Sequence, residues 1–305
     1  MLAGGSGFLG RALAGHFCDA GFDVVILTRT PHEKSGRIRE RIWDGREPGE
    51  WTQELEQAVA IINLTGRSVD CRYTEQNRKE ILESRVRSTR VVGEAIANSK
   101  HPPRVWLNAS TATIYQHTFG PAWDESGTIA DTPEANDVFS VEVARAWENE
   151  LEIARTPSTR KVALRTAMVL GRGKNSVFPV LKRLTRLGLG GEMGTGQQFV
   201  SWIHETDFCR AIEWLVVREE FCDAVNVCTP HPIPNSEMMR VLRSICGAPF
   251  GLPAARWMLE VGAFFLRTEP ELILKSRRVI PRRLVESGFE FQFPKFSEAI
   301  RNLNS

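Results

Sequence analysis

Short apolar runs alternate with amphipathic segments through the first half of the chain. The runs, rich in Val, Ile and Leu, lie at residues 22–28, 59–64, 104–109 and 162–170. Continuous apolar runs of this length are typical of parallel strands buried on both faces. The segments between them that place apolar side chains at helical spacing are 7–20, 74–98 and 137–154. The alternation predicts βαβ units and a doubly wound α/β fold of the Rossmann type.

The pattern changes after Gly171. A glycine-rich stretch at 187–196 is followed by an aromatic run at 199–204, a helical pattern at 205–218 and a strand-like run at 224–228. The most apolar stretch, 254–266, carries Arg256 and Glu260 and is too short to span a bilayer, so we predict an amphipathic helix there. We infer a small C-terminal α/β lobe that closes over the carboxyl ends of the strands, where ligands bind in such folds.

A glycine-rich loop follows the first three residues of the chain. It has the sequence Gly4-Gly5-Ser6-Gly7-Phe8-Leu9-Gly10 and leads into the predicted helix. Gly4 and Gly7 permit a tight turn and close approach of a pyrophosphate, and Gly10 permits close helix–strand packing. The helix N-terminus offers N–H groups to the anion. We therefore predict a dinucleotide site that includes Gly4, Ser6, Gly7, Phe8, Leu9 and Gly10.

The end of the next run, about 20 residues after the loop, bears on the choice of dinucleotide. NAD sites usually carry an acidic residue there, which bonds the ribose 2′-hydroxyl. This chain has Thr28 and Arg29 instead. A hydroxyl and a guanidinium suit a 2′-phosphate, so the prediction is NADP(H). The alternative for Arg29 is a solvated surface side chain.

The first strand is short, because only Met1-Leu2-Ala3 precede the glycines. A strand in such a sheet usually needs about five residues. Either the natural start lies upstream or the fold accommodates a shortened central strand. We expect a variant with about three or four added apolar residues before Met1 to be more stable.

Composition and charge restrict the partners. The chain has 305 residues with 39 basic and 37 acidic side chains, which leaves no broad basic field for nucleic acid. Its six cysteines include no C-x-x-C pair, which is typical of reduced thiols and favours a cytoplasmic location without zinc. The histidines show no metal-ligand spacing, so no metal site is expected. We expect neither a signal peptide nor a membrane span.

Further short motifs occur along the whole chain. They are Ile62-Asn63-Leu64-Thr65-Gly66, Ser84-Arg85, Leu164-Arg165-Thr166 with Val169-Leu170-Gly171, Leu187-Gly188-Leu189-Gly190-Gly191, Trp202-Ile203-His204 with Asp207, and Pro281-Arg282-Arg283-Leu284 before Gly288-Phe289. Together with the glycine loop, they resemble the extended or atypical short-chain dehydrogenase/reductases. More narrowly, the combination resembles the NAD-dependent epimerase/dehydratase-like proteins that are named epimerase family proteins or nucleoside-diphosphate-sugar epimerases.

This resemblance implies a fold and a set of cofactor contacts. The fold is a seven-stranded parallel sheet with a small C-terminal substrate lobe. The implied contacts are Leu64, Thr65 and Gly66 beneath the adenosine ribose, Glu80 and Arg85 on the next helix, and Val169 near the nicotinamide. From the residues alone, Leu64 and Val169 also suit strand packing, and Arg85 also suits a solvated helix face. We assign residues 1–170, completed by 203–229, to the NADP-binding domain, and 171–202 with 230–305 to the lobe.

The chain lacks one feature that the superfamily implies. Members that move hydride carry Y-x-x-x-K after the fifth strand, where the lysine lowers the tyrosine pKa. Neither Tyr73 nor Tyr115 has a lysine four residues on, and Phe139 or Ser140 stands near the tyrosine position. Without the lysine, we expect a tyrosine to keep a pKa of about 10 and to be a poor base. Hydride transfer should then be slow or need little proton assistance.

Three hydroxyl-bearing residues remain as catalytic candidates. Ser110 and Thr111 follow the run 104–109 and occupy the Ser/Thr region of the superfamily. Tyr115 stands where related sugar-nucleotide enzymes have the tyrosine of a V-Y-G turn, and we expect it beside the nicotinamide. The alternatives are hydroxyls that cap a loop and a half-buried aromatic side chain. We interpret His204 and Asp207 structurally, with Asp207 in a first helical turn.

The sequence thus predicts an NADP(H)-binding, epimerase-like oxidoreductase. Its substrate would be a nucleotide-sugar or a small carbonyl or hydroxyl compound. The alternative is a non-catalytic redox sensor that reports NADPH status to a partner, which the missing Tyr–Lys pair favours. The C-terminal lobe favours the enzyme, because a bare sensor needs no enclosed second pocket. A homodimer remains open.

Overall fold

Seven parallel strands form the central sheet of the computed structural model, which describes residues 1–32, 36–260 and 269–305. Their order across the sheet is β10-β6-β5-β4-β1-β2-β3. The strands are β1 (Leu2–Ala3), β2 (Val24–Thr28), β3 (Ile38–Ile42), β4 (Ala60–Asn63), β5 (Val105–Thr111), β6 (Arg160–Thr166) and β10 (Asp223–Val227). Because all neighbours are parallel, their carboxyl ends meet at one edge. The predicted α/β fold class is confirmed.

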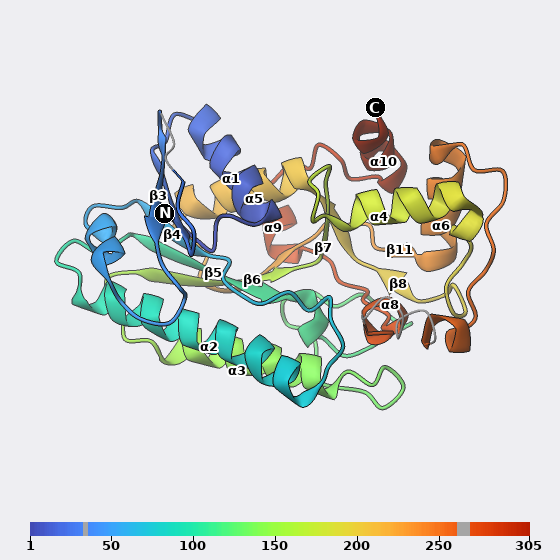
Figure 1. Ribbon diagram of the computed structural model, residues 1–305, viewed down its shortest axis with the longest axis horizontal. Coiled ribbons are helices and arrows are strands. Elements are labelled where there is room, and N and C mark those ends of the chain that lie inside the picture. The colour runs from blue at the N-terminus through green and yellow to red at the C-terminus, as the bar shows by residue number, and fades with distance from the viewer. Residues whose placement is uncertain (33–35, 261–268) are drawn as a thin grey trace.

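Helices cover both faces of this sheet (Figure 1). One face carries α2 (Glu75–Asn98) and α3 (Val138–Ile153), and the other carries α1 (Phe8–Asp19) and α5 (Glu205–Val217). The strands serve both layers because successive side chains alternate. In β2, Ile26 packs in the core under α1 and α5, whereas Val25 and Leu27 pack in the core under α2. This double burial explains the continuous apolar runs.

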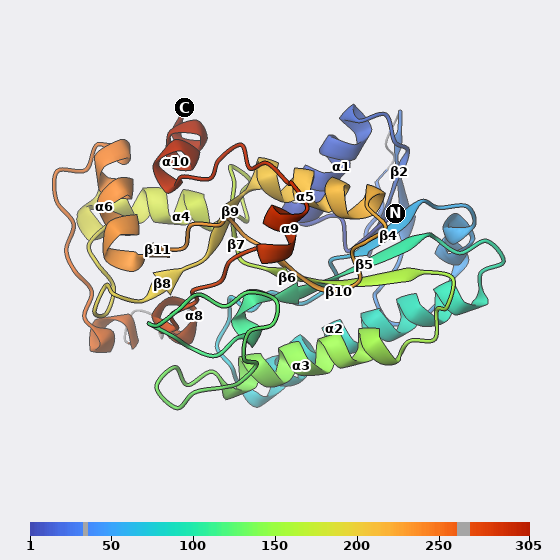
Figure 2. The ribbon, with the colours of Figure 1, turned by 180° about the vertical axis from the view of Figure 1, so that it is seen from behind.

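Several of the remaining elements form a smaller lobe at one end of the molecule (Figure 2). They are α4 (Val177–Leu184), the helical turn η3 (Thr185–Leu189), β8 (Phe199–Val200), β11 (Ile233–Pro234), α6 (Asn235–Cys246), α8 (Glu271–Leu274) and α10 (Phe296–Asn304). Its core includes Phe178, Leu242 and Ile300. The helix α9 (Arg282–Glu286) packs beside β10 instead. No helix within the described ranges is both long and apolar enough to cross a membrane.

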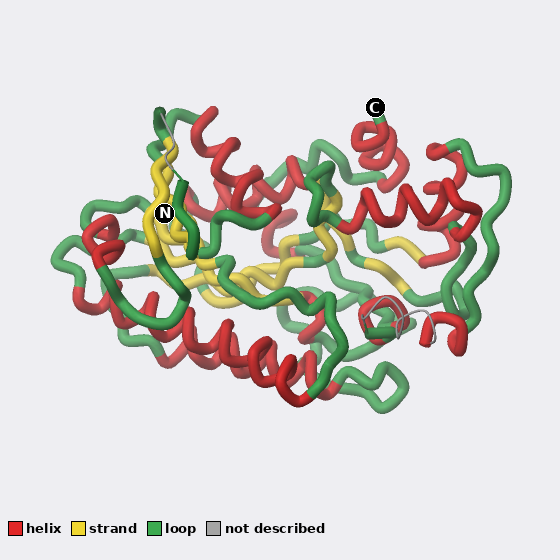
Figure 3. Tube along the Cα trace, viewed as in Figure 1, coloured by secondary structure: helices red, strands yellow, loops and turns green. Residues whose placement is uncertain are grey.

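The structure divides two of the predicted elements and adds one. The run 162–170 breaks between β6 and β7 (Met168–Leu170), which pairs with β9 (Trp202–His204) in a separate sheet. The aromatic run 199–204 divides into β8 and β9. The unpredicted strand β3 is the polar edge of the main sheet. The predicted helix 254–266 is helical at 256–260, and its residues 261–268 lie outside the described part. Figure 3 shows these short strands beside the longer ones of the main sheet.

The first strand, β1, is as short as expected. Leu2 pairs with Ile26 on one side and Ile62 on the other, although β2 begins two residues earlier, at Val24. The Met1 amino group donates to the Ala60 carbonyl at 2.8 Å. A cavity of about 340 Å³ lies at this amino-terminal edge. Its lining includes Met1, Phe17, Phe22, Val24, Glu54 and Ala60.

We expect an extension of β1 ahead of Met1 by about three apolar residues to stabilise the protein. The added side chains would fill apolar space between β2 and β4, and the added backbone would complete their hydrogen bonding. Each buried side chain contributes about 1.5–3 kcal/mol before its ordering entropy is subtracted, so we expect a net gain of about 2 kcal/mol or more. Thermal midpoints of both forms with saturating NADPH measure the effect. An unchanged midpoint would mean that the short strand is already well accommodated.

The amino group of Met1 also predicts how the stability of the protein depends on pH. Burial lowers the pKa of the Met1 amino group to about 6, although the charge of Glu54 opposes this shift. The unfolded chain, with a pKa of about 8, therefore binds more protons between these values, and stability rises with pH across that window by up to about 3 kcal/mol. The extended variant should lose this rise.

Candidate cofactor and substrate site

The glycine loop between β1 and α1 needs its glycines for space and for backbone conformation. Gly4 has a positive φ of 70°, and a Cβ there would lie 2.9 Å from Thr65 Oγ1. A Cβ on Gly10 would lie 2.3 Å from the Gly5 Cα, so the helix can approach the loop only without it. Gly7 is the N-cap of α1 and supplies no side-chain acceptor. The first N–H groups of α1 are therefore free for an anion.

A cavity of about 650 Å³ opens beside this loop at the carboxyl edge of the sheet. We call it the dinucleotide cavity. Predicted contacts that line it are Gly4, Ser6, Gly7, Thr28, Arg29, Leu64, Thr65, Gly66 and Glu80. The hydroxyl oxygen of Thr65 is buried there without a hydrogen-bond partner. An orphaned hydroxyl, free helix N–H groups and a basic rim together fit the phosphate and ribose groups of a dinucleotide.

Part of this lining was not anticipated from the sequence. Trp43, Asp44, Gly45 and Arg46 border the dinucleotide cavity because they follow the unrecognised edge strand β3. The carboxylate of Glu80, which we expected to face the cofactor, forms an ion pair with Arg67. Both residues line the cavity.

Five other predicted contacts lie outside the dinucleotide cavity, and one of them, Gly10, packs against Gly5 and lines neither cavity. The Phe8 ring packs on the chain at Gly171 and Gly173, where a Cβ would approach it to 2.4 Å. Leu9 and Arg85 line a second, neighbouring cavity. Val169 lies in β7, packs against the core under α1 and α5, and is in the lining of neither cavity.

The second cavity, of about 260 Å³, lies at the carboxyl ends of β4, β5 and β6. Leu64 lines both cavities, so they adjoin. Apolar and aromatic walls come from both lobes, and hydroxyl groups face the space between them. The lining includes Ile81, Phe139, Trp147, Phe208 and Leu272, together with Tyr73, Ser110, Thr111, Thr113, Ser140 and Thr166.

A buried polar row stands behind the second cavity. The sheet register places Ser110 of β5 beside Arg165 of β6, and Arg165 beside Asn226 of β10. The Ser110 hydroxyl donates to Glu148 Oε1 at 2.6 Å. Arg165 holds both oxygens of Glu148, at 2.9 and 2.8 Å. Burial lowers the pKa of Arg165, but hydrogen bonds and charge from Glu148 raise it further, above its ordinary value. Glu148 is therefore a fixed acceptor for the Ser110 proton.

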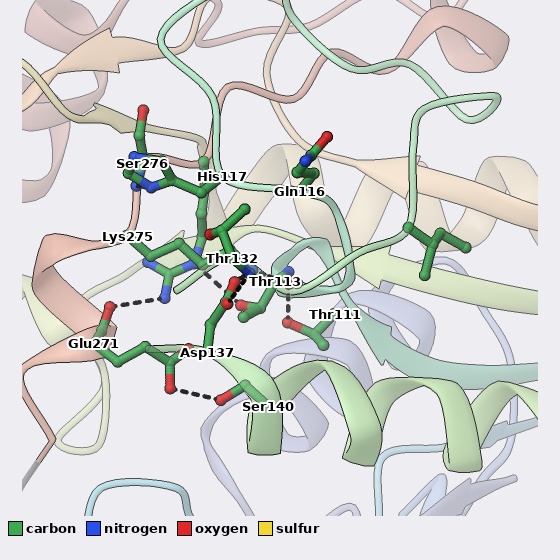
Figure 4. A network of polar contacts seen from close by, with 12 residues as sticks. Thr111, Thr113, Gln116, His117, Thr132, Asp137, Ser140, Glu271, Lys275 and Ser276 are labelled. Carbon is green, nitrogen blue, oxygen red and sulfur yellow. Dashed lines mark hydrogen bonds and ion pairs between the residues drawn. The ribbon is translucent and has the colours of Figure 1, made fainter. Parts of the chain in front are cut away.

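Residues 269–277 of the lobe, which we call the fastening segment, hold in place the wall of the second cavity that contains Leu272 (Figure 4). Glu271 accepts a hydrogen bond from Ser140 Oγ at 2.7 Å. Lys275 forms a fully buried ion pair with Asp137 at the start of α3 and donates to the Thr113 carbonyl at 2.6 Å. Burial raises the pKa of Glu271 and lowers that of Lys275. The segment thereby holds Leu272 against the cavity.

Comparison with protein families agrees with this architecture. Residues 1–228 match the family described as NAD dependent epimerase/dehydratase. The chain belongs to the NAD-dependent epimerase/dehydratase family. Residues 254–303 also match a domain of unknown function, DUF1731, so the fastening segment lies in a region whose role the family model leaves open.

Several members of the family are similar to this chain over nearly its whole length. Epimerase family protein SDR39U1 of Bos taurus is 30% identical and is covered to 98%, with 99% of this chain aligned. Epimerase family protein YfhF of Bacillus subtilis is 29% identical and is covered to 96%, with the same share of this chain aligned. The crystal structure of human SDR39U1 with NADPH is 28% identical, has a TM-score of 0.84, and is covered to 97% with 99% of this chain aligned.

The placement of Tyr115 is a correction to the sequence-based expectation for this epimerase/dehydratase chain. Tyr115 is only 1% exposed and is absent from the lining of the second cavity. Its hydroxyl donates to Asn226 Oδ1 at 2.8 Å and accepts from Arg165 at 2.8 Å. These bonds hold Tyr115 in the core, so we no longer count it as a proton donor.

Tyr73 is the tyrosine that borders the second cavity. The loop before α2 folds inward because the Tyr73 N–H donates to Glu269 Oε1 of the lobe at 2.6 Å. Burial raises the pKa of Tyr73 to about 12 and that of Tyr115 also to about 12. The expected value of about 10 is therefore too low, and both tyrosines are poorer bases than we predicted.

His204 and Asp207 have the structural roles that the sequence predicts. His204 caps α5, because its Nδ1 accepts from the Thr206 N–H at 3.1 Å. Asp207 is fully buried and accepts from the N–H groups of Gln292 and Phe293, both at 2.8 Å. The pair therefore secures the C-terminal segment.

Proposed function

We propose that this protein is an NADP(H)-binding, epimerase-like oxidoreductase that acts on a small carbonyl or hydroxyl compound in the second cavity. The observation that carries the proposal is the hydrogen-bonded Ser110–Glu148 pair beside a cavity that adjoins the dinucleotide cavity. The NADPH in the human relative of similar fold supports the choice of cofactor.

Most of the proposed cofactor contacts line one of the two cavities, and Gly10 packs against the glycine loop. The phosphates and adenosine would lie in the dinucleotide cavity, with the nicotinamide toward Leu64 and the second cavity. The proposed contacts are Gly4, Ser6, Gly7, Leu9, Gly10, Thr28, Arg29, Leu64, Thr65, Gly66 and Glu80. When bound, the nicotinamide supplies or takes a hydride, which is chemistry that no side chain provides.

Ser110 and Glu148 handle the proton that accompanies the hydride. In oxidation, Ser110 Oγ accepts the hydroxyl proton of the substrate and passes its own proton to Glu148. In reduction, Glu148 returns that proton through Ser110 to the carbonyl oxygen. Arg165 keeps the carboxylate oriented in both directions, and Thr111 offers a second hydroxyl to the same oxygen.

The redox-sensor alternative has one observation in its favour, which is that neither tyrosine has a pKa suited to catalysis. A turnover experiment separates the two functions. Purified protein is incubated with NADPH or NADP⁺ and panels of carbonyl compounds, alcohols and nucleotide-sugars. We expect turnover with a small compound. NADPH binding without turnover across the panels would support the sensor, and absence of NADPH binding would contradict both functions.

We expect Arg29→Ala to weaken NADPH binding and to leave NADH binding nearly unchanged. Arg29 is exposed at the rim of the dinucleotide cavity, where its guanidinium can reach a 2′-phosphate. A charge-assisted hydrogen bond contributes about 1.5–3 kcal/mol, so the NADPH dissociation constant should rise roughly 10-fold to 100-fold. Fluorescence titration with both cofactors measures the change. Equal wild-type affinity for the two would contradict the assignment.

A further inference from the structure

Arg85 brings a positive charge to the second cavity. It lies on α2, where its guanidinium stacks 5.0 Å from the centre of the Trp147 ring. Its hydrogen bonds go only to backbone carbonyls, those of Arg67 at 3.0 Å and Ile81 at 2.9 Å. Within the described ranges, no carboxylate lies within ion-pair distance of Arg85. The second cavity therefore contains a cation that no carboxylate in the described ranges neutralises.

The nearby acids are engaged elsewhere. Glu148 is held by Arg165, Glu80 by Arg67, and Glu271 accepts from Ser140. Burial lowers the pKa of Arg85 to about 10, and the groups that oppose this shift are Tyr73 and Cys71. Tyr73, whose pKa burial raises to about 12, is uncharged near pH 7. Arg85 thus stays a cation at neutral pH, and the described part of the chain places no counter-charge beside it.

Arg85 is half-buried, and a partly desolvated charge without a partner carries a free-energy cost that falls when an anion binds beside it. The phosphates of the cofactor are not the anion that the lining favours. The glycine loop and the N-terminus of α1 face the dinucleotide cavity, whereas Arg85 lines the second cavity. The counter-ion of Arg85 should therefore be part of whatever enters the second cavity.

We propose that the substrate is a small oxo acid or hydroxy acid, whose carboxylate pairs with Arg85 while its carbonyl or hydroxyl group lies at Ser110 and Thr111. This proposal rests on the proposed function and names the substrate class for that same site. Planar carboxylates suit a guanidinium, which can offer two parallel N–H donors. The aromatic side chains Phe139 and Trp147 would cover the body of the acid.

The size of the second cavity favours the same class. Its volume of about 260 Å³ lies below the roughly 300–1,000 Å³ of pockets that take drug-sized ligands. A nucleotide-sugar carries a base, two sugars and two phosphates, and so it needs more room than the cavity offers. A small monocarboxylate fits both the volume and the single positive charge.

The test compares two probes of nearly equal shape, benzoate and benzamide, of which only benzoate is charged. Each is titrated calorimetrically into wild-type protein, with and without saturating NADP⁺. We expect benzoate to bind about 10-fold to 100-fold more tightly than benzamide, because only it makes a charge-assisted contact. Equal affinities, or no binding of benzoate, would overturn the proposal.

Three variants assign the preference to Arg85. Arg85→Gln should remove the preference for benzoate, and Arg85→Lys should retain part of it. The matched control is Arg145→Gln on α3, an exposed arginine that bonds the Ile129 carbonyl and should leave the preference intact. If Arg85→Gln does not fold, Arg85→Lys and the wild-type probe comparison still decide the question.

NADPH titration of the same variants separates this proposal from the proposed function. We expect the NADPH affinity of Arg85→Gln to stay within about threefold of wild type, because its partner is the substrate. A loss of about tenfold or more, without a wild-type preference for benzoate, would make the cofactor phosphates the counter-ion and overturn the proposal. Failure of wild-type protein to bind NADPH would contradict the proposed function, while the titrations without cofactor would still report on Arg85.

Discussion

Ser110→Ala is expected to slow hydride transfer about 100-fold to 10,000-fold and to leave NADPH affinity nearly unchanged. The reason is that Ser110 connects the second cavity to Glu148 through a 2.6 Å hydrogen bond, and alanine breaks the proton path without entering the dinucleotide cavity. Once the panels identify a substrate, single-turnover oxidation of bound NADPH measures the rate. A wild-type rate in Ser110→Ala would remove this proton path from the proposal.

Tyr115→Phe is the matched control for this experiment. It removes a hydroxyl from the same polar row, but from a residue outside both cavities. Losing a partner of Arg165 and Asn226 should lower the free energy of unfolding by about 1–3 kcal/mol. The hydride-transfer rate of the folded variant should remain within a few-fold of wild type. A rate loss as large as that of Ser110→Ala would return Tyr115 to the catalytic site.

Lys275→Met is expected to destabilise the protein by about 3–5 kcal/mol. Lys275 and Asp137 are both 0% exposed, so removal of the lysine leaves a buried carboxylate without its counter-ion. Asp137 also accepts from the Thr132 N–H at 2.7 Å, which holds it in place and prevents its escape to solvent. Urea unfolding at neutral pH measures the loss.

Two further variants identify the cause of that loss. The double variant Lys275→Met/Asp137→Asn removes both charges and should recover much of the stability. Lys79→Ala breaks an exposed ion pair with Glu83 on α2 and should change stability by less than about 0.5 kcal/mol. A loss below about 1 kcal/mol in Lys275→Met would show that the pair is not coupled to folding.

The sequence predicts the strands of the sheet well where burial dominates. Parallel strands buried on both faces leave a local signal in the form of continuous apolar runs, and the glycine loop leaves a signal through its spacing. The break between β6 and β7 at Ala167 leaves no such signal in the sequence. Met168 turns away to bond Ser201, and that partner is distant in the sequence. Likewise, β3 reads as a polar segment because an edge strand exposes one side to solvent.

The candidate site was predictable in part. Ser110 and Thr111 border the second cavity because strand ends meet at the carboxyl edge of the sheet. Tyr115 follows a short helical turn, η2 (Ala112–Ile114), which directs it toward Arg165 and Asn226 instead. Neither this orientation of Tyr115 nor the hydrogen bond from Tyr73 to Glu269 is visible in the sequence, because both depend on contacts between distant segments.

Arg85 could have been singled out from the sequence by helical spacing. It lies four residues after Ile81 and seven before Val92, two positions that the pattern places inward. That register puts Arg85, which is half-buried, on the side of α2 that carries these inward positions. The absence of an acid beside it, however, is visible only in three dimensions.

The residues that line the two cavities are synthesised at different times. Among the residues that the structure describes, those that line the dinucleotide cavity all belong to the first 87 positions. The second cavity also needs Phe208 and Leu272, which come much later in the sequence. Because synthesis proceeds from the amino terminus, the residues of the dinucleotide cavity leave the ribosome long before Leu272 of the second cavity. The second cavity can thus be complete only after synthesis has passed residue 272.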